Sequence, residues 1–202
     1  MNWQNILYSL PGIILGLTIH EYCHALAAYK LGDPTARDMG RLTFNPVKHI
    51  DPIGSLFIIF AGFGWAKPVQ FNPENLRHPR LYKAIIAAAG PLSNLVLALA
   101  LVALFRALQT TPELTVNYTI LIIILRAAMI NLGLFIFNLF PIPPLDGSHI
   151  VFSGLNLSQE TQIKIMKIGG PLLFLILIIQ NTTNITILPI GRLIMAILTF
   201  LL

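Results

Sequence analysis

Charged residues are scarce in this chain, and their scarcity indicates the class of protein. Only 10% of the 202 residues are charged and 55% are hydrophobic, whereas a soluble domain carries about 25% charged residues. The mean hydropathy is +0.76. This composition excludes a disordered, fibrous or nucleic-acid-binding chain and predicts an integral membrane protein that lies in a lipid bilayer. Cys23 is the only cysteine, which excludes a secreted domain built on disulfides.

Long apolar runs predict the membrane spans. A helix needs about 20 apolar residues to cross a hydrocarbon core of about 30 Å. Residues 6–29, 82–108 and 116–140 meet this requirement. Residues 163–202 are interrupted by polar residues at 180–184, and we interpret them as a helical hairpin of two short spans. The sequence therefore predicts an all-α polytopic membrane protein with about five transmembrane helices.

One further apolar run, Pro52–Trp65, is too short to span and predicts a short re-entrant segment. Basic residues flank it evenly, which places both flanks on one side of the membrane. They are Lys30, Arg37, Arg41 and Lys48 before the run, and Lys67, Arg77, Arg80 and Lys83 after it. The positive-inside rule then predicts a cytoplasmic location for residues 30–83 and 141–163, with the N-terminus outside.

Two cytoplasmic segments have the pattern of short strands. Gly40–Phe44 and Trp65–Phe71 are bounded by glycine, proline and asparagine, and they predict a small cytoplasmic β-hairpin. Pro68 would confine the second strand to a sheet edge. We expect no cleaved signal peptide, because the N-terminus lacks a basic start and a clear small-residue cleavage site.

The first span contains His20-Glu21-Tyr22-Cys23-His24, an HExxH pattern. Residues i and i+4 share one helix face, so the two imidazoles can bind one metal ion. Glu21 can then serve as a carboxylate base, as in zinc hydrolases. Ionisable side chains deep in a membrane are costly without a partner, and a divalent cation supplies a common one.

A catalytic zinc ion takes three protein ligands and keeps one open position. Asp146 is the acidic residue placed to supply the third ligand, since it follows a proline-rich turn at the end of the third span. The alternative is an ordinary surface Asp-Gly turn. His149 could be a partner of a ligand, an alternative ligand, or simply a polar group at the turn.

Two asparagines in the spans have alternative interpretations. Asn94, after Gly90-Pro91, and Asn138 could bind the substrate backbone or a developing oxyanion. Each could equally make an ordinary hydrogen bond between helices.

Several separated motifs together resemble the site-2 protease family of intramembrane zinc metalloproteases. They are HEYCH in the first span, GPLSN in the second, NLFPIPPLDG after the third, and HIDPIGSLF and GWAKPVQFNPENLRHPR between the first two spans. The resemblance covers roughly residues 13–152. It implies one zinc ion per chain, held by His20, His24 and Asp146, with Glu21 as catalytic base.

The same resemblance implies an endopeptidase that cleaves transmembrane protein substrates in or near the bilayer. The chain looks like the compact branch of the family, without PDZ or CBS domains. We expect residues 1–202 to form a single metalloprotease domain in the cell membrane, with a catalytic core at about 6–155 and the helical hairpin at about 163–202. Its active site would open to the cytoplasm. The alternative is a non-hydrolytic membrane metal-binding protein, such as a transporter or sensor. Glu21 discriminates between the two, because a transport site needs no base beside its ligands.

Overall fold

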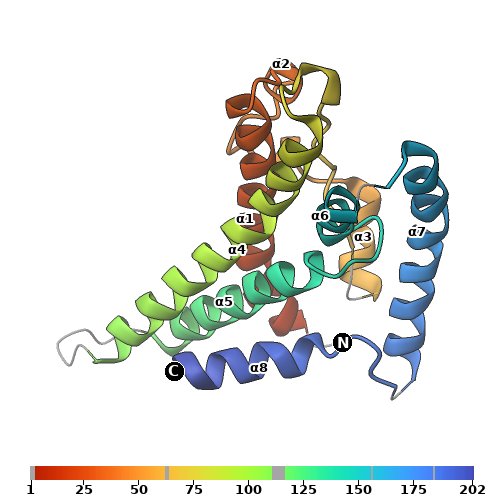
Figure 1. Ribbon diagram of the computed structural model, residues 1–202. Helices are drawn as coiled ribbons and strands as arrows, with labels where there is room; N and C mark the ends of the chain where they lie inside the picture. Colours follow the sequence, from red (N-terminus) through yellow and green to blue (C-terminus); the bar gives the residue numbers. More distant parts are fainter. Residues whose placement is uncertain (1–2, 62–63, 111–116, 156, 184) are drawn as a thin grey trace.

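The computed structural model describes residues 3–61, 64–110, 117–155, 157–183 and 185–202, and its regular elements are helices. Gly62 of the predicted re-entrant run and Val116, at the predicted start of the third span, lie outside these ranges. Figure 1 shows long helices that alternate in direction along the chain. The elements are α1 (Trp3–Lys30), α2 (Thr35–Asp38), η1 (Pro46–Lys48), α3 (Pro52–Ala61), η2 (Pro73–Asn75), α4 (Pro79–Thr110), α5 (Tyr118–Asn138), α6 (Asp146–Leu155), α7 (Gln159–Thr182) and α8 (Ile190–Leu201).

Four helices in the described part of the chain, α1, α4, α5 and α7, are long and apolar enough to cross a membrane. The all-α multi-pass prediction is thus confirmed, but the predicted count of five spans is wrong. The last apolar stretch is not a hairpin of two spans, because α7 takes 24 residues and α8 only 12. At 1.5 Å per residue, α8 reaches about 18 Å.

Helix α8 packs across the second half of α4 and the middle of α5 instead of running back along α7 (Figure 1). Leu198 joins a buried cluster with Ala98, Val102, Ala128 and Leu132. Arg106 of α4 donates a hydrogen bond to the carbonyl of Leu201 at 2.9 Å, which fixes the end of α8. The amide oxygen of Gln180 accepts from the backbone N–H groups of Ile187 and Leu188 and closes the turn between α7 and α8.

Close contact between α1 and α5 depends on glycine. A Cβ atom on Gly12 would lie 2.6 Å from the Cα of Ala127, and one on Gly16 would lie 2.7 Å from the Oδ1 of Asn131. Small residues four apart allow two membrane helices to approach closely. The next residues at this spacing on α1 are His20 and His24, so the packed face of α1 continues directly into the candidate site.

The two ends of the short run Pro52–Trp65 lie next to each other. Asp51 caps α3 by accepting the N–H of Gly54 at 2.8 Å. Ile50 and Ala66, which flank the run, form an antiparallel bridge. A Cβ on Gly54 would collide with the backbone of Trp65, so the returning chain lies against the start of α3.

The predicted β-hairpin is not formed by the described residues. Gly40–Phe44 is a turn, and Trp65–Phe71 is extended but pairs only at the isolated bridge to Ile50. The reason is that some backbone N–H groups of Trp65–Phe71 are absent or bonded outside a sheet. Pro68 has no N–H, and the N–H of Val69 donates to the carboxylate of Glu21 at 2.9 Å. The extended segment therefore lies against α1 rather than in a sheet.

Asp33 connects the end of α1 to the segment that leads into α4. Its carboxylate accepts from Thr35, Asn72 and Asn75 at distances between 2.5 and 3.1 Å. Burial alone would raise the pKa of Asp33, but these hydrogen bonds outweigh it and hold the pKa below its usual value.

We expect Gly12→Ala to destabilise the protein by about 1–3 kcal/mol, because the added methyl group overpacks the contact between α1 and α5. Gly170→Ala in α7 is the matched control, since a Cβ there meets nothing within 4 Å. Denaturant titration of both variants in detergent tests this. Equal stability of the two variants would contradict the proposed close contact.

Candidate metal centre

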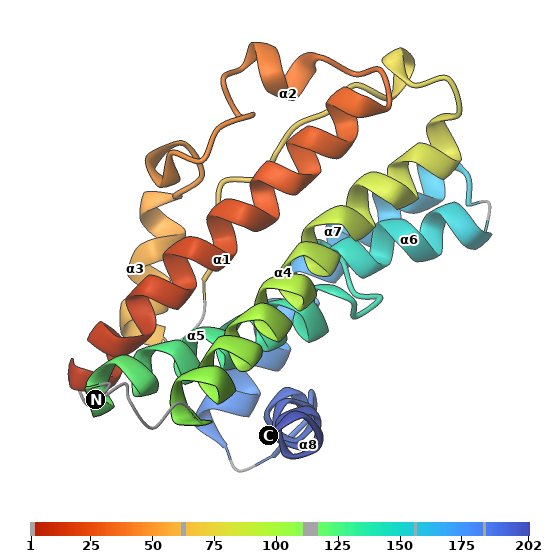
Figure 2. The same cartoon turned by 90° about the vertical axis from the view of Figure 1, so that its left-hand side faces the viewer.

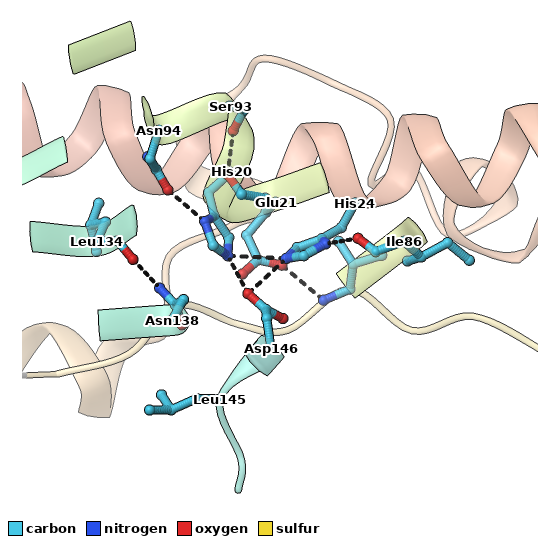
Figure 3. A network of polar contacts seen from close by, with 12 residues as sticks. His20, Glu21, His24, Ile86, Ser93, Asn94, Leu134, Asn138, Leu145 and Asp146 are labelled. Atoms are coloured by element: carbon cyan, nitrogen blue, oxygen red, sulfur yellow. Dashed lines mark hydrogen bonds and ion pairs between the residues drawn. The ribbon is translucent and has the colours of Figure 1, made fainter. Parts of the chain in front are cut away.

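Three potential ligands converge on one point between α1 and α6 (Figure 3). The Nε2 atoms of His20 and His24 are 3.0 Å apart. The Oδ2 atom of Asp146 lies 3.2 Å from the first and 3.4 Å from the second. Among the described residues, these side chains form the one group of three possible ligands whose ligand atoms lie within 4.8 Å of one another.

Helix α1 presents both imidazoles to α4 because they are four residues apart. Gly90 of α4 makes room for them, since a Cβ there would collide with His24 and would lie 2.7 Å from the Cε1 of His20. Gly90 and Pro91 both lie inside α4. In the structure α4 continues through both, and Gly90 serves the close approach of the histidines.

Asp146 reaches the histidines as the first residue of α6, after the turn that ends α5. A Cβ on Gly147 would collide with the carbonyl of Leu139, so the start of α6 crosses directly over the end of α5. Helix α6 lies along the first half of α4 (Figure 2). Arg80 of α4 holds the other end of α6 by donating to the carbonyls of Ser153 and Gly154 at 2.5 and 3.1 Å.

Hydrogen bonds at the Nδ1 atoms show which nitrogen of each imidazole ring is left free to bind a metal ion. Nδ1 of His20 lies 2.6 Å from the amide oxygen of Asn94, and Nδ1 of His24 lies 2.7 Å from the carbonyl of Ile86. Both partners are acceptors, so each Nδ1 carries the proton and each neutral Nε2 presents a lone pair. In this neutral tautomer three electron-donating atoms face one another, and Oδ2 of Asp146 is buried without a hydrogen bond.

This donor set fits a zinc ion. Ligands at about 2.0–2.1 Å in a tetrahedral site are about 3.3 Å from one another. The three observed separations are 3.0, 3.2 and 3.4 Å. Imidazole nitrogen and carboxylate oxygen are also the ligand types of catalytic zinc sites.

Asn94 is fully buried and makes three hydrogen bonds. Besides accepting from His20, it donates to the carbonyl of Gly16 at 3.1 Å and to the amide oxygen of Asn131 at 2.8 Å. Both amide hydrogens are used within the protein. This placement favours the interhelical alternative and lets Asn94 orient the ring of His20.

Asn131 was not identified from the sequence. It is fully buried and completes the chain of hydrogen bonds by donating to the carbonyl of Ala127 at 2.8 Å. A polar amide in the middle of an apolar span was the available signal, because such groups are costly in lipid and need partners.

Glu21 lies next to the three ligands but is held by a different segment (Figure 3). It is 7% exposed, and its Oε2 accepts the N–H of Val69 at 2.9 Å. Its Oε1 accepts no hydrogen bond from the part of the chain that the structure describes. Glu21 therefore has one anchored oxygen and one that is available for a reacting group.

A cavity of about 350 Å³ opens onto these residues. Its wall includes Glu21, Asn138, His149 and Lys83, together with part of the extended segment 65–71. Asn138 lines this cavity and donates to the carbonyl of Leu134 at 2.9 Å. His149 lines the cavity without joining the group of three ligands.

The fold and the site together define a class of protein, a multi-pass helical membrane protein with a His–His–carboxylate centre of the zinc-hydrolase type. Comparison with known proteins agrees with this class. The model of peptidase family M50 matches residues 8–123 and 109–179. The chain therefore belongs to peptidase family M50, the site-2 protease family that its motifs resemble, and is a zinc metalloprotease.

Individual relatives support this membership. The chain is 36% identical over 185 residues to "Putative zinc metalloprotease YwhC" of Bacillus subtilis, which covers 90% of this chain and 84% of that protein. Proteins with the same description and the name Rip2 are 30% identical over 180 residues in Mycolicibacterium smegmatis and 27% identical over 181 in Mycobacterium tuberculosis. Both alignments cover 87% of this chain and 68% of the relative. No solved structure gives a significant match.

We expect Asn94→Ala to weaken zinc binding about 10- to 100-fold, because His20 loses the acceptor that fixes its ring. Ser93→Ala is the matched control, since the Ser93 hydroxyl donates to the backbone carbonyl of Gly90 rather than to a histidine. Competition with a zinc chelator measures both affinities. An unchanged affinity in Asn94→Ala would contradict the orienting role.

Proposed function

We propose that this zinc metalloprotease is an intramembrane endopeptidase that hydrolyses peptide bonds in or near the transmembrane segments of membrane proteins. The observation that carries the proposal is the depth of the site in α1. His20 lies ten residues before the end of a helix that is long and apolar enough to span, about 15 Å along its axis. A site at that depth favours substrates that are themselves in the membrane.

We assign His20, His24 and Asp146 as the zinc ligands and Glu21 as the general base. The convergence of three unprotonated donor atoms supports the first assignment, and the free Oε1 of Glu21 beside them supports the second. When bound, zinc would polarise the scissile carbonyl and make water a stronger nucleophile near neutral pH. The runner-up from the sequence, a transporter or sensor, has no observation in its favour.

The reaction requires two proton movements, and we assign both to Glu21. Its Oε1 takes a proton from the attacking water as oxygen bonds to the scissile carbon, and later donates that proton to the leaving amine. The products are a carboxylate and a free amine. The N–H of Val69 stays hydrogen-bonded to Oε2 during both proton transfers. Oε1 is therefore the oxygen that exchanges the proton with the reacting groups.

A helical substrate must become extended to expose its peptide bonds, and the segment Trp65–Phe71 offers an edge for this. Backbone groups alternate sides along an extended chain. The N–H of Lys67 faces the carbonyl of His49, and the N–H of Val69 faces the carboxylate of Glu21. The carbonyl groups of Ala66, Pro68 and Gln70, with the N–H groups of Ala66 and Gln70, therefore point to the opposite side of the segment. We propose that the substrate pairs with that edge and that Asn138 contacts its backbone.

The orientation proposed from the basic residues remains part of this function. Residues 30–83 and 141–163 would face the cytoplasm, and the cavity would open to that side. The adjacent flanks Ile50 and Ala66 support a single side for the re-entrant run. Residues 1–202 would act as one protease domain, with its catalytic core at about 6–155.

We expect Glu21→Gln to retain one zinc ion per chain and to lose cleavage of a transmembrane peptide by at least about 100-fold, as general base catalysis supplies a factor of that size. Asp146→Ala should lose both zinc and activity. Metal analysis and mass spectrometry of products from proteoliposomes provide the two readouts. Normal cleavage by Glu21→Gln would show that another group is the base.

A further inference from the structure

Arg41 is a buried cation that the proposed reaction has not yet used. It is 5% exposed and belongs to the turn after α2. The turn is fixed by Gly40, whose φ of +68° is left-handed, and by the N–H of Arg41, which donates to the carbonyl of Ala36 at 2.8 Å. A buried guanidinium is costly without partners, so its contacts indicate its purpose.

The guanidinium contacts the general base and the substrate-edge segment at once. Its Nη2 donates a hydrogen bond to the carbonyl of Lys67. The same nitrogen lies 4.0 Å from Oε2 of Glu21. This is the oxygen that accepts the N–H of Val69, two residues after Lys67. Arg41, Glu21 and the segment Lys67–Val69 thus form a closed triangle of contacts.

The segment Lys67–Val69 is also held by the loop that contains His49. The N–H of Lys67 donates to the carbonyl of His49 at 2.8 Å. Nε2 of His49 lies 2.8 Å from the carbonyl of Thr43, and the His49 side chain is 1% exposed. The loop from Arg41 to His49 therefore holds the extended segment, and Arg41 supplies the charge that faces Glu21.

We propose that Arg41 is a positioning residue for peptide hydrolysis. It holds Oε2 of Glu21 and the carbonyl of Lys67 in one arrangement, so that Oε1 of Glu21 remains directed at the reacting water. The planar guanidinium can serve a carboxylate and a carbonyl together, whereas the compact ammonium of lysine serves one of them well. This inference rests on the proposed role of Glu21 as base.

The experiment uses the full-length, zinc-loaded protein in proteoliposomes with a transmembrane peptide substrate. We expect Arg41→Gln to lower kcat about 10- to 100-fold, the range typical of residues that support a metal site from outside. The zinc content should be unchanged, because Arg41 contacts none of the three ligands. Arg41→Lys should recover part of the lost kcat.

Arg37→Gln is the matched control. It removes the same charge four residues away, where the arginine is exposed and pairs with Asp38 at 2.7 Å. This variant should cleave at the wild-type rate.

A double-mutant cycle with Glu21→Asp separates positioning from general stability. Shortening the carboxylate removes its contact with Arg41. The fold-loss in kcat caused by Arg41→Gln should therefore be much smaller in the Glu21→Asp background than in the wild type. Equal fold-losses in both backgrounds would overturn the inference. The cycle is also run with Arg41→Lys, so that it remains decisive if Arg41→Gln does not fold.

Two failures are distinguishable. A wild-type rate in folded Arg41→Gln, with Glu21→Gln inactive, would overturn the role of Arg41 alone. No cleavage of any membrane peptide by the zinc-loaded wild type would overturn the proposed function, and this inference with it.

Discussion

The mutual approach of three lone-pair donors is the constraint on which the rest of this structure depends. Two neutral imidazole nitrogens and a carboxylate oxygen at 3.0 to 3.4 Å repel one another unless a cation lies among them. In the interior of a helical bundle, where water is scarce, this repulsion is stronger than at a surface. The surrounding packing brings these atoms together, since Gly90 of α4 leaves room for both imidazoles.

That arrangement is built from close packing and from buried amides. Gly12, Gly16 and Gly90 allow α1 to contact α5 and α4 with almost no side chain between them. Asn94 and Asn131 then satisfy each other, the helix backbones and His20. A polar network of this kind is stable in an apolar bundle only when each member is paired. His20, a candidate metal ligand, is therefore oriented by the same contacts that hold the three helices together.

Much of the candidate site could be predicted from the sequence, because it depends on local rules. The four-residue spacing of His20 and His24 determines a shared helix face, and the shortage of acidic residues in the spans pointed to Asp146. The role of Asn94 could not be decided, since nothing in the sequence shows which partner a buried amide faces. Asn131 and Arg41 were missed for the same reason, as their importance comes from contacts with residues far away in the chain.

The predictions of the fold likewise succeeded where local sequence determines the structure and failed where contacts with distant residues determine it. Helix existence followed from apolar length, and four of the five predicted spans are present as candidates. The fifth failed because α8 is short and packs across α4 and α5. The predicted hairpin failed because the N–H of Val69 finds its acceptor on α1. Propensity identified an extended segment there, but only tertiary contacts decide its partner.

Zinc K-edge X-ray absorption of the purified protein tests the central claim most directly. The account predicts a shell of nitrogen and oxygen at about 2.0–2.1 Å, with the outer-shell pattern of two imidazoles, and the loss of this signal in Asp146→Ala. A sulfur shell at about 2.3 Å, or one imidazole only, would contradict the assignment of His20, His24 and Asp146 as the metal ligands.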